Sequence, residues 1–502
     1  MVAPQPSASA ILWRRVNDHL EVFWVQRDAR LAFAGGFYAF PGGRVDAADA
    51  NAPVLQTIAP EETAHLSACA RELFEETGVL CVRDADGARP SVSADERRAL
   101  RRDLTERSPK SGERPGRFAD LLRARGLAVD ARDFAFAGRW ITPRFMPIRF
   151  DARFYLVECP ANETADVWEG ELTHGEWIRP EVALARWRAG TALLHPPARH
   201  CLEVLAEDGP TPRGLERLRN PPDVDAESVA KRIDFQQGVL LIPLRTPTLP
   251  PWTHTNAFLL GEDALVLIDP GSPYPEEQAV LSGALRALAS EGRRLTEILL
   301  THWHHDHVAG AETIARETGA RIVAHRETAA RAGLRVDRLI DDGASWSLGS
   351  HRWRALYTPG HTRGDLCLLD ESSGALLAGD TVAGMGTVVI DPPDGDMTDY
   401  VRSLERLATL QLRTIYPAHG PAIADGPAKI TEYIRHRADR EAQIARALAQ
   451  RGRATPAELV ADVYTDVSPA LHPIAARSVL AVLEKLERAG KVRRAGSFFE
   501  SV

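Results

Sequence analysis

Alternating apolar and polar positions predict half-buried strands in the N-terminal part of the chain. The clearest are residues 134–143, FAFAGRWITP, and residues 149–158, RFDARFYLVE. Between about residues 84 and 117 the chain is polar and rich in arginine and proline, which predicts an insertion with a short helix. Residues 208–225 are again polar and proline-rich, as is typical of a linker. We therefore expect one domain over residues 1–225.

Short apolar runs alternate with helical patterns after this linker. Residues 238–244 and 256–271 predict successive strands, the second with a turn at 261–263. Further strands are expected at residues 297–301, 321–325, 375–379 and 414–418. Strands separated by helices are typical of an α/β domain, which we assign to residues 226–437.

The last part of the chain has a different, mainly helical pattern. Three helices are predicted, around residues 440–449, 456–464 and 475–489, and a small hairpin follows at 491–500. Three helices followed by a hairpin are the outline of a winged-helix domain, which we assign to residues 438–502.

Length and composition agree with a multidomain protein outside the membrane. The chain has 502 residues, more than one hydrophobic core usually serves, and no apolar run approaches the twenty or so residues that cross a bilayer. Its five cysteines form no CxxC pair, and the N-terminal residues lack the pattern of a secretory signal. We therefore expect a cytoplasmic protein with no membrane partner. The net charge of −8 argues only mildly against a nucleic-acid-binding surface.

Seven side chains of the metal-binding type are concentrated in loops of the second domain. Four lie within six residues, directly after an apolar strand: His302, His304, Asp306 and His307. Three more lie in short loops that contain glycine or proline: His361, Asp380 and His419. A single histidine of this kind more often packs or faces solvent. A cluster of imidazole and carboxylate groups predicts a divalent metal site.

The HxHxDH motif and the later single His, Asp and His residues resemble the metallo-β-lactamase superfamily. The resemblance implies two zinc ions, although iron or manganese would fit the same ligands. The implied ligands are His302, His304 and His361 for one ion and Asp306, His307 and His419 for the other, with Asp380 bridging. Asp306 and Asp380 are also the catalytic carboxylates, and Asp269 is the structural aspartate that supports the metal loop.

Within the superfamily, residues 232–502 resemble the beta-lactamase-like protein 2 family, which implies cleavage of single-stranded RNA. The alternative is a glyoxalase II-type thioesterase, which shares the ligands and would act on acyl-CoA or acyl-glutathione. Antibiotic hydrolysis is disfavoured, because Asp380 stands where the commonest zinc β-lactamases have a cysteine. Lys491, Arg493 and Arg494 would contact phosphates at the wing, or else this part would form a lid or a homodimer contact.

An acidic helix marks the first domain. Glu72, Glu75 and Glu76 share one helix face, where like charges are unfavourable without a cation. With the glycines of FPGG, they resemble the Nudix box, whose glutamates bind Mg²⁺ or Mn²⁺ against a diphosphate. The resemblance gives structural roles to Gly43, Arg71 and Gly78, and catalytic roles to Glu75 and Glu76.

The box departs from the standard spacing in one respect. An extra segment, VDAADANAPVLQTIAP, separates Gly43 from Arg71, so that counting back from Arg71 places the isolated first glutamate of the box on Thr63. Residues 8–207 are similar to the coenzyme A diphosphatase branch, which implies a nucleotide or CoA-type substrate. The alternative is a sensor that binds the nucleotide without hydrolysing it.

We thus predict an α/β and α+β multidomain protein. A Nudix α/β/α fold is followed by a metallo-β-lactamase αββα sandwich and then by a small winged-helix domain.

Overall fold

A computed structural model describes residues 3–31, 34–105, 117–143, 148–168, 170–221, 233–250, 252–465 and 467–502. The chain forms two compact units, Met1–Asp225 and Ala226–Val502. The expected boundary between residues 225 and 226 lies outside the described residues. Within the described ranges, no helix is both long enough and apolar enough to cross a membrane.

The first unit is built on a seven-stranded mixed sheet of order β3-β2-β1-β8-β7, in which β4 also pairs with β1 and β9 with β2. Its strands are β1 (Gln5–Val16), β2 (His19–Arg27), β3 (Tyr38–Ala39), β4 (Gly42–Arg44), β7 (Phe134–Ile141), β8 (Phe150–Glu158) and β9 (Leu172–Ile178). A separate pair consists of β5 (Arg83–Asp84) and β6 (Leu127–Ala128). The two strands predicted most clearly from the sequence are thus confirmed as β7 and β8.

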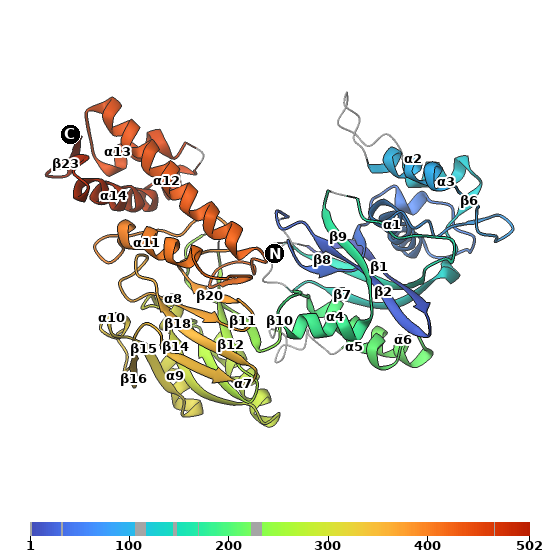
Figure 1. Cartoon of the computed structure of the whole chain (residues 1–502), viewed down its shortest axis with the longest axis horizontal. Coiled ribbons are helices and arrows are strands. Elements are labelled where there is room, and N and C mark those ends of the chain that lie inside the picture. Colours follow the sequence, from blue (N-terminus) through green and yellow to red (C-terminus); the bar gives the residue numbers. More distant parts are fainter. Residues whose placement is uncertain are drawn as a thin grey trace. The chain divides into compact units, whose positions relative to one another are not determined.

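Helices cover both faces of this sheet (Figure 1), because neighbouring residues of β1 face opposite sides. Ala10 and Leu12 belong to one hydrophobic core, whereas Ile11 belongs to the other. The first core contains α1 (Pro60–Thr77), α2 (Ala94–Thr105) and α3 (Phe118–Ala124). The second contains α4 (Pro180–Arg188), α5 (Pro196–Glu207) and α6 (Pro212–Arg219). The expected α/β/α layering is confirmed, and α2 lies in the predicted insertion.

Two sheets face each other in the second unit. The first, in the order of the chain, comprises β10 (Ile233–Gln236), β11 (Val239–Arg245), β12 (His254–Leu260), β13 (Ala264–Ile268), β14 (Arg294–Leu300), β15 (Arg321–His325) and β16 (Arg338–Ile340). The second comprises β17 (Ser345–Leu348), β18 (His351–Tyr357), β19 (Leu366–Asp370), β20 (Leu376–Gly379) and β21 (Ile415–Pro417). Phe258 and Tyr416, one from each sheet, have ring centroids 6.0 Å apart.

Helices cover the outer faces of these two sheets, which gives the expected αββα sandwich (Figure 1). The first sheet packs on α7 (Pro275–Ser290) and α9 (Ala311–Thr318). The second packs on α11 (Met397–Ala408) and α12 (Gly426–Arg451). Two short helices, α8 (His305–Val308) and α10 (Arg326–Ala329), lie in the loops that follow β14 and β15.

The C-terminal part has the predicted outline of three helices and a hairpin. After α12 come α13 (Pro456–Val463) and α14 (His472–Arg488), with a small sheet of order β22-β24-β23. The strands of this sheet are β22 (Arg453–Ala454), β23 (Val492–Ala495) and β24 (Phe498–Ser501).

Helix α12 departs from the prediction, because it begins at Gly426 rather than near Arg440 and therefore crosses the expected boundary at residue 437/438 (Figure 1). Asp425 caps this early start by accepting the Ala428 N–H at 3.0 Å. One hydrophobic core then runs along the helix, so the metallo-β-lactamase part and the winged helix share their interior.

Candidate metal centre and acidic-helix site

The seven candidate ligands lie in loops at the carboxyl ends of strands from both sheets. His302 and His304 follow β14, and Asp306 and His307 lie in the short helix α8. The loops after β18, β20 and β21 carry the remaining three: His361, Asp380 and His419. Because these strand ends meet at one edge of the sandwich, side chains distant in sequence come together.

Asp380 lies between two groups of histidines. Its Oδ2 is 3.5 Å from His361 Nε2 and 4.0 Å from His302 Nε2. Its Oδ1 is 3.3 Å from His419 Nε2 and 3.6 Å from His307 Nε2. Each carboxylate oxygen therefore faces a different pair of imidazoles, as a bridging ligand requires.

The remaining two ligands complete these groups. His304 Nδ1 lies 3.0 Å from His302 Nε2 and 3.1 Å from His361 Nε2. Asp306 Oδ2 lies 3.5 Å from the Nε2 atom of His419. Three groups have ligand atoms within 4.8 Å of one another: His302, His304, His361 and Asp380; Asp306, His307 and His419; and Asp269, His302 and His307.

Oxygen acceptors fix the ring orientation of four histidines through Nδ1. His302 Nδ1 donates to the Thr301 hydroxyl at 3.1 Å, His307 Nδ1 to Asp269 Oδ2 at 2.8 Å, His361 Nδ1 to the Val389 carbonyl at 2.8 Å and His419 Nδ1 to the His254 carbonyl at 3.1 Å. In each ring Nε2 is then left to point into the site with its lone pair. His304 is the exception, because it presents Nδ1.

Asp269 is hydrogen-bonded to the loop that carries four of the candidate ligands. It accepts the N–H and the hydroxyl of Thr301, at 2.8 and 2.5 Å, in addition to the His307 ring. Its backbone has a φ of 50°, in the left-handed region that non-glycine residues seldom adopt. A Cβ atom on Gly271 would overlap with the Asp306 carbonyl group, so this close approach requires glycine.

The charges around the site favour a bound cation. Burial and the neighbouring imidazoles lower the pKa of His302 well below its usual value and that of His304 to about 3, so both rings are neutral. Burial also opposes the charged forms of His307 and His419, yet the carboxylates, Asp380 foremost, raise the pKa of both rings. Those two imidazoles hold the pKa of Asp380 well below its usual value despite its burial.

The donor set fits a divalent metal. His307 Nε2 is buried and has no hydrogen-bond partner in the structure, although its Nδ1 is bonded. A buried nitrogen of this kind is costly unless it has a ligand. Imidazole nitrogens with carboxylate oxygens are a typical set for zinc, and they also accept iron or manganese. Among the described residues, groups of three or more such ligands were found only around this centre.

In the first unit, helix α1 places its acidic residues beside the glycines of β4. Glu76 Oε2 accepts the Gly42 N–H at 2.8 Å, and a Cβ atom on Gly43 would overlap with the Glu72 carboxylate. Burial and then the charge of Glu72 raise the pKa of Glu76 well above its usual value. Gly78 ends the helix in the left-handed conformation, with a φ of 73°.

Arg71 lies at the centre of this arrangement. Its Nη1 is 2.7 Å from Glu72 Oε1 and 3.4 Å from Glu75 Oε2, and its Nη2 donates to the Arg44 carbonyl at 2.8 Å. Burial opposes the charge on the guanidinium, but the surrounding carboxylates, Glu72 foremost, raise its pKa above the usual value. Arg71 therefore ties two of the glutamates to strand β4.

The sequence did not predict a further carboxylate that binds Arg71. This carboxylate is Asp49 from the inserted segment, which receives Nε and Nη2 of Arg71, each at 3.0 Å. The side chains of Asp49 and Arg71 are 4% and 6% exposed, so the ion pair is shielded from solvent. The sequence feature that could have indicated this partner is the pair of aspartates in the inserted segment VDAADAN.

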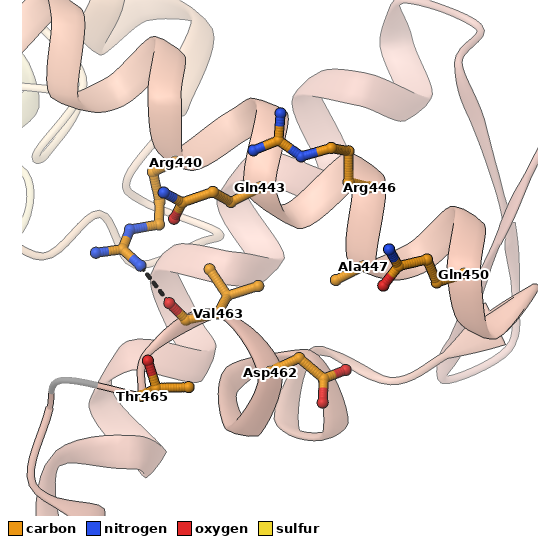
Figure 2. A pocket seen from close by; sticks show the side chains of 8 residues that line it. All are labelled: Arg440, Gln443, Arg446, Ala447, Gln450, Asp462, Val463 and Thr465. Carbon is orange, nitrogen blue, oxygen red and sulfur yellow. Dashed lines mark hydrogen bonds between the residues drawn. The ribbon is translucent and has the colours of Figure 1, made fainter.

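A cavity of about 480 Å³ lies between α12 and α13 of the second unit, and none of the candidate metal ligands lines it. Figure 2 shows its lining, which consists of Arg440, Gln443, Arg446, Ala447, Gln450, Asp462, Val463 and Thr465. Arg440 donates to the Val463 carbonyl at 2.5 Å. The wing arginines are already paired with carboxylates, Arg493 with Glu500 at 2.7 Å and Arg494 with Glu484 at 3.2 Å.

Comparisons with known families agree with the second unit. A model of the Metallo-beta-lactamase superfamily matches residues 250–419, and one of the Beta-lactamase associated winged helix domain matches residues 455–500. The Beta-lactamase-like protein 2 homolog of Caenorhabditis elegans is 34% identical over 242 residues, which cover 47% of this chain and 80% of that protein. The Atrochrysone carboxyl ACP thioesterase of Passalora fulva is 29% identical over 264 residues, 50% of this chain and 73% of that protein.

The fold and the metal centre together define a metal-dependent hydrolytic enzyme. The chain belongs to the metallo-β-lactamase superfamily, and its second unit is a homologue of beta-lactamase-like protein 2. A crystal structure of a NUDIX hydrolase from Alicyclobacillus acidocaldarius is 27% identical, with a TM-score of 0.38, and the match covers 44% of this chain and 100% of that one.

Proposed function

We propose that the second unit is a dinuclear zinc hydrolase that cleaves single-stranded RNA, and that the first unit hydrolyses a diphosphate such as that of CoA. The position of Asp380 supports the proposal for the second unit most directly, because its two carboxylate oxygens face different groups of histidines. This geometry favours two metal ions held at a fixed distance from each other.

Two zinc ions bound there would supply an activated water and neutralise charge on the substrate. The chain keeps His302 and His304 neutral, so that their lone pairs remain available. Asp380 fixes the spacing of the two groups, and we assign Asp306 as the carboxylate that takes the proton of the attacking water. Asp269 binds Nδ1 of His307 and so keeps Nε2 of that ring directed toward the metal site.

Two observations favour RNA as the substrate. The first is the homology to beta-lactamase-like protein 2 over the metal centre, because the sequence resemblance to that family implies cleavage of single-stranded RNA. The cavity between α12 and α13 also presents Arg440 and Arg446, with two glutamine amides, as donors for phosphate oxygens (Figure 2). The wing arginines are less available, because each is paired with a carboxylate.

Cleavage of end-labelled single-stranded RNA by the zinc-loaded chain tests this proposal. We expect cleavage by the wild type and by Glu76→Gln, and none by Asp380→Ala. Arg446→Gln should weaken RNA binding and reduce its salt dependence without changing the zinc content. Absence of cleavage by every form would refute the RNA substrate.

A thioesterase is the second candidate, and apolar side chains near the metal centre favour it. Leu249 is 51% exposed and Met385 is 50% exposed. Leu249 follows Thr248, whose hydroxyl is 3.5 Å from His419 Nε2, and Met385 follows Gly384, whose N–H donates to the His419 carbonyl at 2.8 Å. An acyl chain could pack on these side chains. Turnover of acyl-CoA or acyl-glutathione that is lost in Asp380→Ala, without RNA cleavage, would establish this function instead.

The diphosphate-hydrolysing proposal for the first unit is supported by the buried Arg71 and its carboxylates beside the glycines of β4. Mg²⁺ or Mn²⁺ bound by the glutamates of α1 would neutralise a diphosphate. We expect Mg²⁺-dependent hydrolysis of the CoA diphosphate by the wild type, with 4′-phosphopantetheine and adenosine 3′,5′-bisphosphate as the products. Glu76→Gln should abolish it, whereas Glu62→Gln, an exposed change in the same helix, should not. A wild type that binds CoA but releases neither product would identify a sensor.

A further inference from the structure

The segment between Asp380 and α11 connects the metal centre with the C-terminal helices. Residues 381–396 form neither helix nor strand. Within them, the Val389 carbonyl accepts the Nδ1–H of His361 at 2.8 Å. This irregular segment therefore sets the ring orientation of a metal ligand.

Two buried side chains from the C-terminal helices hold the residues on either side of Val389. Ser478 of α14 accepts the Ile390 N–H with its Oγ at 3.2 Å. Arg437 of α12 donates from Nη2 to the Val388 carbonyl at 2.6 Å. Both peptide groups that flank Val389 are thereby hydrogen-bonded to the C-terminal helices.

Further contacts bind the rest of the segment to these helices. The Tyr433 hydroxyl of α12 accepts the Ala383 N–H and donates to the Gly386 carbonyl, each at 2.9 Å. Arg488 of α14 pairs with Asp396 at 2.7 Å. The Ile390 side chain is fully buried in the core that the C-terminal helices share with the second sheet.

We propose that the winged-helix part is a structural component of the metal centre: Ser478 of α14, together with Arg437 from the part of α12 that precedes the winged helix, positions His361 through the Val388–Ile390 backbone. A segment without regular structure keeps one conformation only if other groups offset the entropy of ordering it. Here those groups come from α12 and α14. The winged helix then has a role in metal binding whether or not it contacts nucleic acid.

Metal affinity of the full chain tests this role without relying on activity. Ser478→Ala and Arg437→Met each remove one contact to the segment and keep most of the side-chain volume. We expect each variant to lose zinc to a competing chelator about tenfold more readily than the wild type. Ser282→Ala is the matched control, because Ser282 is also a buried serine but its hydroxyl has no partner in the structure.

A second measurement separates positioning from general destabilisation. The Nδ1–H proton of His361, identified by its loss in His361→Gln, should exchange faster with solvent in Ser478→Ala. The Nδ1–H proton of His307, which Asp269 holds, should keep its rate. Wild-type zinc retention and wild-type exchange at His361 in both variants would overturn the proposal. If Arg437→Met does not fold, Ser478→Ala decides alone.

Discussion

Replacing Asp49 by asparagine should destabilise the acidic-helix site, because it breaks a buried ion pair. The change leaves the Arg71 guanidinium charged, 6% exposed and without its bidentate partner. Removing one partner of a buried pair costs about 3–5 kcal/mol. Asparagine keeps one acceptor oxygen, and Arg71 keeps its ion pair with Glu72 at 2.7 Å, so we expect at most about 3 kcal/mol, the lower end of that range.

Hydrogen exchange of the α1 amides in the full chain measures this loss locally, without requiring the two units to unfold together. About 3 kcal/mol corresponds to roughly hundredfold faster exchange. Asp46→Asn is the matched control, because the Asp46 carboxylate is 3.9 Å from Arg71 and 63% exposed. Its effect should be small.

A double-mutant cycle gives the decisive result. If Asp49 acts through Arg71, then Asp49→Asn should have little further effect in a chain that already carries Arg71→Gln. Equal effects of Asp49→Asn in both backgrounds would refute the reasoning, as would unchanged protection of α1 in the single variant.

Three further predictions concern the second unit. Asp269→Asn should lower zinc affinity about 10- to 100-fold, because it loosens the His307 ring; a competition titration with a chelator that shows wild-type affinity would contradict this. Gly271→Ala should lose metal by displacing the metal loop, which metal analysis after dialysis would show. Asp370 raises the pKa of His351 above that of the unfolded chain, so the charged ring stabilises the fold fully below about pH 6.5 and less as pH rises through the folded pKa. His351→Gln should therefore cost about 1–2 kcal/mol at pH 5.5 and less at pH 9, as measured by urea unfolding.

The cluster of candidate metal ligands could be predicted from the sequence, because it consists of histidine and aspartate side chains in a recognisable order. Four ligands lie in one short motif, and the other three follow in family order. The groups that orient them leave no such signal. The acceptors for His361 and His419 are backbone carbonyls, of Val389 and His254, which any residue supplies.

Contacts across an insertion were equally hard to predict. Counting back along the box placed its isolated first glutamate on Thr63 and gave no role to the inserted segment, because a fixed spacing assumes an uninterrupted loop. The folded chain brings Asp49 to Arg71 from 22 residues away. The start of α12 was missed for a local reason, since the Gly426–Pro427 pair is typical of a loop but here begins a capped helix.

The continuous helix α12 has a consequence for the order of events during synthesis. The core around it includes residues of α14 and of β24, Val479 and Phe499 among them. A nascent chain that ends within α12 would leave the part of this core that packs on α14 and β24 exposed, an apolar surface that favours aggregation. We expect the first unit to fold while translation continues, and the second to acquire zinc only after β24 has left the ribosome.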